Sequence, residues 1–185
     1  RYEGTWESKG EFLKRSPVIP IDELIEKLSS GIQLEECMYT TNNIYIIGTS
    51  FGGGIALSLK DSSSLKSVYA VSPVINFKDV PNIDNLESFL KDKQKDNYRF
   101  ISAQWNRLIT DQIYNPYKDF NISPKKIIIC GGLNDDQIPK DVLERFSKIK
   151  GVDCTFIPDA GHITISKITK DLAGSIISFF IKNHY

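Results

Sequence analysis

The sequence contains little of what metal sites, membrane spans and nucleic-acid-binding surfaces require. It has only two histidines, and its three cysteines lack the paired spacing that holds zinc. Its 23 basic and 23 acidic residues cancel, and no block of one sign favours nucleic acid or an anionic membrane surface. The longest apolar runs are too short to cross a bilayer. We therefore expect no metal, no cofactor, no nucleic-acid partner and no membrane association.

Cysteine usage and the opening residues bear on location. Cys37, Cys130 and Cys154 are an odd number, and two of them lie in apolar, strand-like runs, which is typical of buried and reduced thiols. The opening stretch RYEGTWESKGEF is polar and interrupted by glycine, unlike a signal peptide. Both features favour a reducing compartment, and we expect a cytoplasmic protein.

An alternation of strand-like and helix-like segments predicts the fold class. With 185 residues, 41% of them apolar and 25% charged, the chain suits one domain over residues 1–185. Four short runs are apolar on both faces, as in a parallel sheet covered on both sides. With helices between them, they predict a three-layer α/β/α fold with a mostly parallel sheet. The predicted strands are residues 43–48, 67–72, 126–130 and 152–157, and the predicted helices are residues 21–36, 51–60, 140–149 and 171–183.

The connection between the second and third predicted strands is longer than a crossover requires. Residues 74–124 contain one or two helix-like stretches and predict a helical, lid-like insert or pocket wall. This insert is rich in aromatic side chains, which either form an acyl or aryl pocket or pack the insert onto the sheet. These side chains are Phe77, Phe89, Tyr98, Phe100, Trp105, Tyr114 and Tyr117.

A serine stands among glycines where the first predicted strand gives way to a helix. In the stretch GTSFG, Ser50 is flanked at −2 and +2 by Gly48 and Gly52. A strained turn with positive φ at Ser50 lifts its hydroxyl clear of the backbone and needs small neighbours. The amide of Phe51, at the start of the helix, is then a donor for an oxyanion. The alternative is a glycine-rich turn that binds phosphate or nothing, but the spacing of phosphate loops is absent.

With this motif the sequence resembles the α/β-hydrolase superfamily, in which the active residues follow in the order Ser, Asp, His. The stretch CGGLNDDQIP at 130–139 is similar to the superfamily's acid loop, and IPDAGH at 157–162 is similar to its histidine loop. The resemblance implies Ser50 as nucleophile, His162 as general base and Asp135 as the acid that orients it. Asp136 is the alternative acid, since it is adjacent and only the proline of the loop favours Asp135.

The resemblance also implies that part of the fold is not in this sequence. The stretch YEGTWESKGEF is similar to the loop after the superfamily's fourth strand, although an ordinary polar loop is the alternative. The strand at 43–48 is then an uncovered edge, so we expect either that the chain is a fragment or that a second chain covers this edge. The superfamily's second oxyanion donor, which follows its third strand, has no counterpart here.

The function implied is a serine hydrolase that cleaves a small carboxylic ester or thioester through an acyl-enzyme on Ser50. Its partner is a small acyl substrate. A serine oligopeptidase or aminopeptidase-like hydrolase is the alternative with the same residues. A binding protein of different class, a non-catalytic or truncated relative, is the alternative that the absent oxyanion loop favours.

Overall fold

Four apolar segments form the central sheet, and all of their pairings are parallel. The computed structural model describes residues 2–184, and in it the strands lie in the order β3-β4-β5-β6. Each strand overlaps one of the four that were predicted. The strands are β3 (Ile44–Thr49), β4 (Leu65–Val71), β5 (Ile127–Gly132) and β6 (Asp153–Ile157).

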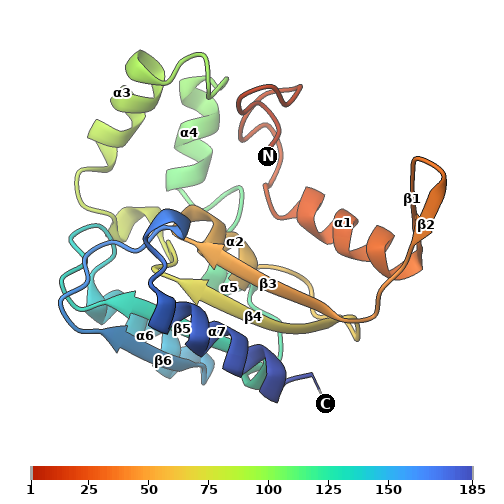
Figure 1. Cartoon of the computed structure of the whole chain (residues 1–185). Helices are drawn as coiled ribbons and strands as arrows, with labels where there is room; N and C mark the ends of the chain where they lie inside the picture. Colours follow the sequence, from red (N-terminus) through yellow and green to blue (C-terminus); the bar gives the residue numbers. More distant parts are fainter. Residues whose placement is uncertain (1, 185) are drawn as a thin grey trace.

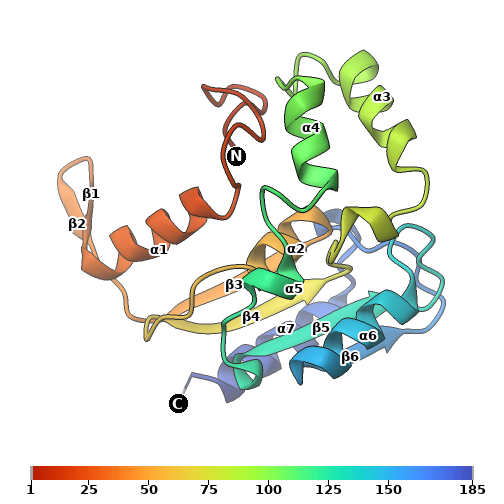
Figure 2. The same ribbon diagram turned by 180° about the vertical axis from the view of Figure 1, so that it is seen from behind.

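Helices cover both faces of this sheet, which confirms the predicted three-layer α/β/α class (Figure 1). Helices α2 (Phe51–Leu57) and α6 (Lys140–Lys150) pack on one face, and α7 (Lys170–Lys182) packs on the other. Figure 2 shows the same layers from behind. The inner strands are buried on both sides, because a parallel sheet lies between helices. No helix within residues 2–184 has the length and apolar character that a bilayer span needs.

The first predicted helix is correct in position but too long. Residues 21–36 were predicted to be helical, whereas α1 (Ile19–Ser30) ends before Gly31. Gly31 has φ of 110°, and its amide hydrogen closes the helix on the Lys27 carbonyl. Strands β1 (Ile32–Leu34) and β2 (Cys37–Tyr39) then form a short antiparallel hairpin that projects from the body (Figure 1).

The segment between β4 and β5 is mostly helical. Figures 1 and 2 show α3 and α4 standing above the sheet, and Lys91 of α3 donates a hydrogen bond to Ser102 of α4. Residues 74–124 therefore form a helical structure over the end of the sheet. Its elements are η1 (Phe77–Asp79), α3 (Ile83–Lys93), α4 (Ser102–Ile109), α5 (Pro116–Asp119) and η2 (Pro124–Lys126), and a further short turn, η3 (Ile165–Lys167), lies before α7.

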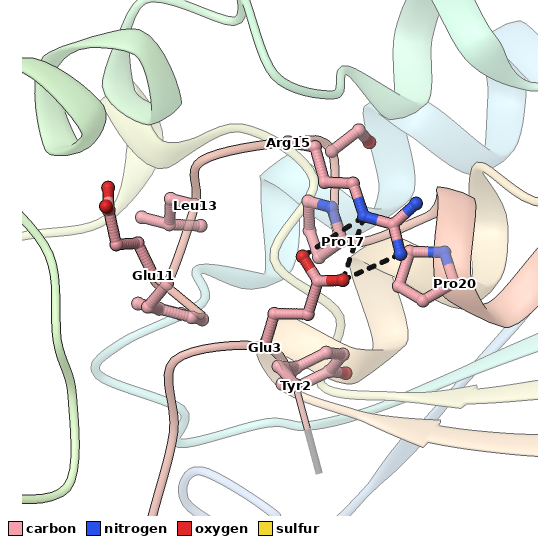
Figure 3. A pocket seen from close by; sticks show the side chains of 9 residues that line it. Tyr2, Glu3, Glu11, Leu13, Arg15, Pro17 and Pro20 are labelled. Carbon is pink, nitrogen blue, oxygen red and sulfur yellow. Dashed lines mark hydrogen bonds and ion pairs between the residues drawn. The ribbon is translucent and has the colours of Figure 1, made fainter. Parts of the chain in front are cut away.

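The first residues fold back on themselves around one ion pair. The Arg15 guanidinium donates to the Glu3 carboxylate at 2.7 Å from Nη2 and 3.1 Å from Nε, a forked pair visible in Figure 3. Its Nη1 also donates to Glu23 of α1 at 3.0 Å. The hollow between these side chains is only about 10 Å³, room for about one water molecule. These contacts therefore hold the start of the chain against α1, and the hollow between them is too small for a substrate.

The same first residues are tied to the helical segment above the sheet. The Trp6 amide donates to the Asn97 carbonyl at 2.9 Å, and the Phe12 amide donates to the Arg99 carbonyl at 2.7 Å. The Arg99 amide returns a bond of 2.8 Å to the Gly4 carbonyl. The start of the chain and the link between α3 and α4 thus hold one another in place.

Candidate active site

Three side chains from three strand ends meet at one edge of the sheet. Ser50 follows β3, Asp135 lies in the loop after β5, and His162 lies in the loop after β6. Because the strands are parallel, their carboxyl ends lie along the same edge, where open α/β sheets bind ligands. Asp135 and His162 are buried, with 9% and 7% of their surfaces exposed. The three residues named from the sequence are therefore neighbours in space.

Ser50 sits in a strained turn between strand and helix. Its φ is 52° and its ψ is −121°, a backbone conformation that costs free energy for any residue with a Cβ. The turn brings the backbone of Gly52 so close to Gly48 that a Cβ on Gly48 would meet the Gly52 carbonyl oxygen and, at 2.9 Å, the Ala56 methyl. Gly48 is thus the glycine that allows α2 to pack directly against the end of β3.

The remaining glycines of the turn differ in how much they are needed. A Cβ on Gly52 would meet only the Tyr2 hydroxyl, at 3.3 Å, and that side chain can move. A Cβ on Gly54 would run into the Val74 carbonyl oxygen. The crowding expected at Gly52 is therefore mild, while Gly54, which the sequence did not single out, is closely enclosed by the segment after β4.

Hydrogen bonds join the three side chains in series. The His162 Nε2 lies 3.0 Å from the Ser50 Oγ. The Nδ1 of the same ring lies 3.0 Å from Asp135 Oδ2 and 3.2 Å from Oδ1. One imidazole therefore connects a hydroxyl to a carboxylate, within the distance over which a proton can be passed.

The Asp135 carboxylate is held in place by the backbone of its own loop. Its Oδ1 accepts hydrogen bonds from the amides of Gln137 at 3.0 Å and Ile138 at 2.9 Å. Burial acts to raise the pKa of Asp135, but the hydrogen bonds from His162 and from the Ile138 amide outweigh it, so the pKa lies below its ordinary value. Asp136, the alternative acid, is exposed, and it is Asp135 that hydrogen-bonds the imidazole.

A second serine supports the loops of the site and was not identified from the sequence. Ser72 follows β4 directly, is fully buried, and has a positive φ of 42°. Its Oγ accepts a hydrogen bond of 3.3 Å from the Ile163 amide, next to His162, and its side chain also contributes to the lowered pKa of Asp135. The only signal in the sequence was its place at the end of a buried strand.

The amide of Phe51 is the first of helix α2, and within residues 2–184 no acceptor is bonded to it. It follows Ser50 directly and belongs to the first turn of the helix, whose amides have no acceptor within the helix itself. The Phe51 ring packs edge-on against Tyr2, with 5.5 Å between centroids, and against Tyr114 at 5.8 Å. These contacts fix the residue that carries the free donor.

Cys130, Cys154 and the second histidine, His184, are not among the three hydrogen-bonded side chains. Burial raises the pKa of the Cys130 thiol in β5 and raises that of the Cys154 thiol to about 12, so neither is a thiolate near neutral pH. His184 contacts the Tyr45 hydroxyl near the end of the chain. In the described part of the chain, no group of three potential metal ligands comes together.

Two hollows open beside Ser50. One is a cavity of about 250 Å³ under α3 and α4, and the other is a groove of about 770 Å³ along the outer edge of β3. Ser50 and Phe51 line both of them. The serine therefore stands where two separate spaces meet, which suits a substrate with two parts.

No protein-family model matches the sequence, and no curated protein matches it. The fold, by contrast, is well represented among solved structures. The alpha/beta hydrolase GrgF from Penicillium sp. sh18 is similar over 98% of this chain and 78% of its own length, with a TM-score of 0.68 and 13% identity. An alpha/beta hydrolase from the metagenome of Mar Chica lagoon sediments, Morocco, is similar over 91% and 70%, with a TM-score of 0.61 and 16% identity.

A third similar structure is acetyl xylan esterase 1 from Thermoanaerobacterium sp. JW/SL YS485. The similarity covers 91% of this chain and 52% of that chain, with a TM-score of 0.54 and 15% identity. At these identities the likeness concerns the fold alone.

Proposed function

We propose, from the α/β-hydrolase fold that this chain has, that the protein is a serine hydrolase acting on a small carboxylic ester or thioester. The observation that carries the proposal is the series of hydrogen bonds from Ser50 Oγ to His162 Nε2 at 3.0 Å and from His162 Nδ1 to Asp135 Oδ2 at 3.0 Å. A serine, a histidine and a carboxylate in this geometry form the arrangement that activates a hydroxyl for acyl transfer.

The proposed reaction has two halves. In the first, Ser50 Oγ attacks the carbonyl carbon while His162 Nε2 takes the hydroxyl proton, and the imidazolium then gives that proton to the departing alcohol or thiol. In the second, water attacks the acyl carbon while His162 takes its proton, and the imidazolium then returns that proton to Ser50 Oγ as the carboxylic acid leaves. Asp135 keeps the imidazole in one orientation and stabilises its charged form. Its lowered pKa supports this role, since the carboxylate is ionised near neutral pH.

The Phe51 amide is the proposed oxyanion donor. Its position directly after Ser50 and its lack of an acceptor within the described residues support this assignment. A preorganised donor of this kind contributes about 10²–10³ in turnover in serine hydrolases. The strained backbone of Ser50 is then the cost of presenting the hydroxyl and the amide to the same carbonyl group.

The choice of an ester rather than a peptide rests on the residues around Ser50. An aminopeptidase must hold a protonated amine, and among residues 2–184 none of those that line the two hollows beside Ser50 is charged. The uncharged lining therefore favours a neutral ester or thioester.

A fluorophosphonate probe tests the proposal, because it reacts covalently with an activated serine. We expect labelling at Ser50, loss of labelling in Ser50→Ala, and full labelling in Ser175→Ala, which changes an exposed serine of α7. A panel of p-nitrophenyl esters, thioesters and aminoacyl anilides then identifies the acyl class. A folded protein that takes no label and turns over no member of the panel would instead be a non-catalytic binding protein.

A further inference from the structure

The cavity of about 250 Å³ beside Ser50 is built from segments far apart in the chain. Phe51 and Val74 lie next to the nucleophile, Phe77 and Leu90 come from the segment after β4, and Trp105 comes from α4. Both α3 and α4 contribute to it, and both stand above the sheet (Figure 1). Because Ser50 itself lines the cavity, a group covalently attached to its Oγ can extend directly into this space.

The walls of this cavity are apolar and largely aromatic. Five aromatic side chains line it, and they contact one another in series. The ring centroids are 5.3 Å apart for Tyr98 and Phe12, 5.9 Å for Phe12 and Phe51, 5.9 Å for Phe51 and Phe77, and 6.2 Å for Phe77 and Trp105. All four pairs meet edge-on, with interplanar angles of 64–70°. A planar apolar group gains favourable contacts with such walls.

No charge is available inside to receive a charged substrate. Within the described residues 2–184, none of the side chains that line the cavity is charged, and Gln137 and the Tyr98 hydroxyl are the polar groups besides Ser50 and the Trp105 indole. The Trp105 Nε1 is itself buried with no hydrogen-bond partner. A carboxylate or ammonium placed here would lose its hydration without compensation. The cavity therefore selects a neutral group.

The volume limits the length of that group. An apolar cavity of about 150 Å³ holds one benzene molecule, and pockets for drug-sized ligands begin at about 300 Å³. With about 250 Å³ the cavity has room for a benzene ring and one or two further carbons, or for roughly eight non-hydrogen atoms at about 30 Å³ each. A long unbranched fatty acyl chain exceeds this space.

The end of the second hollow next to the histidine loop is the place for the other half of the substrate, whereas the rest of this groove runs along the unpaired edge of β3. The groove of about 770 Å³ is lined by Thr164 and Ile165, which follow His162 closely. The imidazole gives its proton to the leaving group, so the leaving group has to lie on the histidine's side. The acyl group remains on Ser50 until water attacks, and the cavity beneath α3 and α4 is the space left for it.

We infer that this cavity is the acyl pocket and that the preferred acyl group is short and aromatic, of the size of phenylacetyl. The inference rests on the proposed function, since it presumes that Ser50 carries the acyl group. Leu86 of α3 is the position that tests it, because it lines the cavity and is 37% exposed, so that a larger side chain can be introduced without overpacking a buried core.

The experiment compares kcat/KM for p-nitrophenyl acetate, phenylacetate and decanoate. We expect phenylacetate to exceed acetate by about tenfold, the usual scale for filling an apolar pocket, and decanoate to fall below phenylacetate. Leu86→Trp should lower kcat/KM for phenylacetate about tenfold and leave acetate within about twofold. Phe89→Trp, a matched change on an exposed residue of α3 that does not line the cavity, should leave both unchanged.

The possible results separate this inference from the proposed function. If Ser50 is labelled and acetate is hydrolysed but phenylacetate gains nothing, or if Leu86→Trp lowers both esters equally, the acyl-pocket assignment is wrong while the hydrolase proposal stands. If nothing is labelled or hydrolysed, both are wrong. Val80→Phe, at a half-buried position of the same cavity, repeats the test should Leu86→Trp fold poorly.

Discussion

At the scale of single residues, Asp135 illustrates how local chemistry depends on distant parts of the chain. Its carboxylate takes two hydrogen bonds from its own loop and one from His162, which lies in the loop after the next strand. The sequence pattern alone left Asp136 as an alternative, because adjacent aspartates differ only in the direction of their side chains. That direction is set by the loop amides of Gln137 and Ile138, which no pattern of residue types encodes.

Replacing Asp135 tests its proposed part in the reaction. Asp135→Asn should lower kcat by about 10⁴, because the amide cannot stabilise the imidazolium and favours the wrong tautomer of His162. Asp136→Asn, which changes the exposed neighbour, should leave kcat within about twofold. Steady-state hydrolysis of p-nitrophenyl acetate measures both. Equal losses in the two variants would contradict the assignment of the acid.

The lowered pKa of Asp135 also predicts how stability depends on pH. The unfolded chain binds a proton at Asp135 near the ordinary pKa of about 3.9, whereas the folded chain binds it only at lower pH. This residue therefore stabilises the fold fully above about pH 4, and its contribution is lost as pH falls through the folded value. Urea unfolding of the wild type should lose more free energy from pH 6 to pH 3 than that of Asp135→Asn.

Asp61 provides a second, independent case of a lowered pKa that should affect the pH dependence of stability. Burial acts to raise its pKa, but hydrogen bonds from Lys126 and the Ser123 amide lower it below the ordinary value. Asp61→Asn should therefore reduce the acid sensitivity in the same direction. If the unfolding free energy of the wild type does not change between pH 6 and pH 3, the lowered pKa values of Asp135 and Asp61 are both wrong.

At the scale of elements, the strands were predictable because burial on both faces imposes a strong pattern. The hairpin of β1 and β2 was not, because each strand has only three residues and Cys37, Met38 and Tyr39 are all exposed. Without a buried face, no alternation of apolar residues is required. The ending of α1 could have been found, since a glycine with positive φ is a common stop for a helix.

The glycines of α2 likewise show how far the sequence alone can predict the structure. The sequence displays three consecutive glycines at 52–54 but does not reveal which of them is enclosed, since that depends on Pro73 and Val74 packing from beyond the next strand. Gly48 was identifiable because its neighbours along the chain form the turn. Gly54 was not, because its neighbour Val74 is contributed by tertiary structure.

Alanine substitutions in two helices should have opposite effects. Gly54→Ala places a Cβ against the Val74 carbonyl oxygen and should lower the free energy of unfolding by about 2–3 kcal/mol. Gly174→Ala, in the middle of α7, places a Cβ in open space and should raise it by about 1 kcal/mol through helix propensity. Thermal or urea denaturation measures the change in the free energy of unfolding for each variant. A higher free energy of unfolding in both variants would show that helix propensity, and not close approach, controls α2.

Helix α3 should be the least protected of the long helices. None of its residues is buried, whereas α6 buries Val142, Leu143 and Phe146. Helices with few buried contacts open locally at little cost in free energy. Hydrogen exchange followed by mass spectrometry should show the amides of α3 exchanging well before those of α6. Equal protection would mean that α3 and the rest of the domain unfold as one unit.

At the scale of the whole molecule, β3 has a strand neighbour on one side only within residues 2–184. The groove of about 770 Å³ runs along its other side, and Ile47 on this strand is 43% exposed. An apolar, unpaired strand edge favours association with another strand. We expect a further segment of a longer protein, or a second chain, to cover this edge.

The 185-residue chain on its own should therefore associate as its concentration rises. Ile47→Lys places a charge at the uncovered edge and should shift association to higher concentration, because charged edges oppose strand pairing. Light scattering coupled to size-exclusion chromatography measures the mass of each variant. Ile177→Lys, which changes a more exposed apolar residue on α7 (58% exposed), is the control. A wild-type chain that stays monomeric at high concentration would contradict this expectation.

The hydrogen-bonded series that ends at His162 has a consequence for how the protein is made. Ser50 and His162 are 112 positions apart, and the histidine loop follows the last strand of the sheet. During synthesis the proposed nucleophile therefore emerges from the ribosome long before its proposed base. In the proposed reaction Ser50 remains an ordinary alcohol until the loop after β6 has docked, so its activation has to wait until the chain has been made as far as His162.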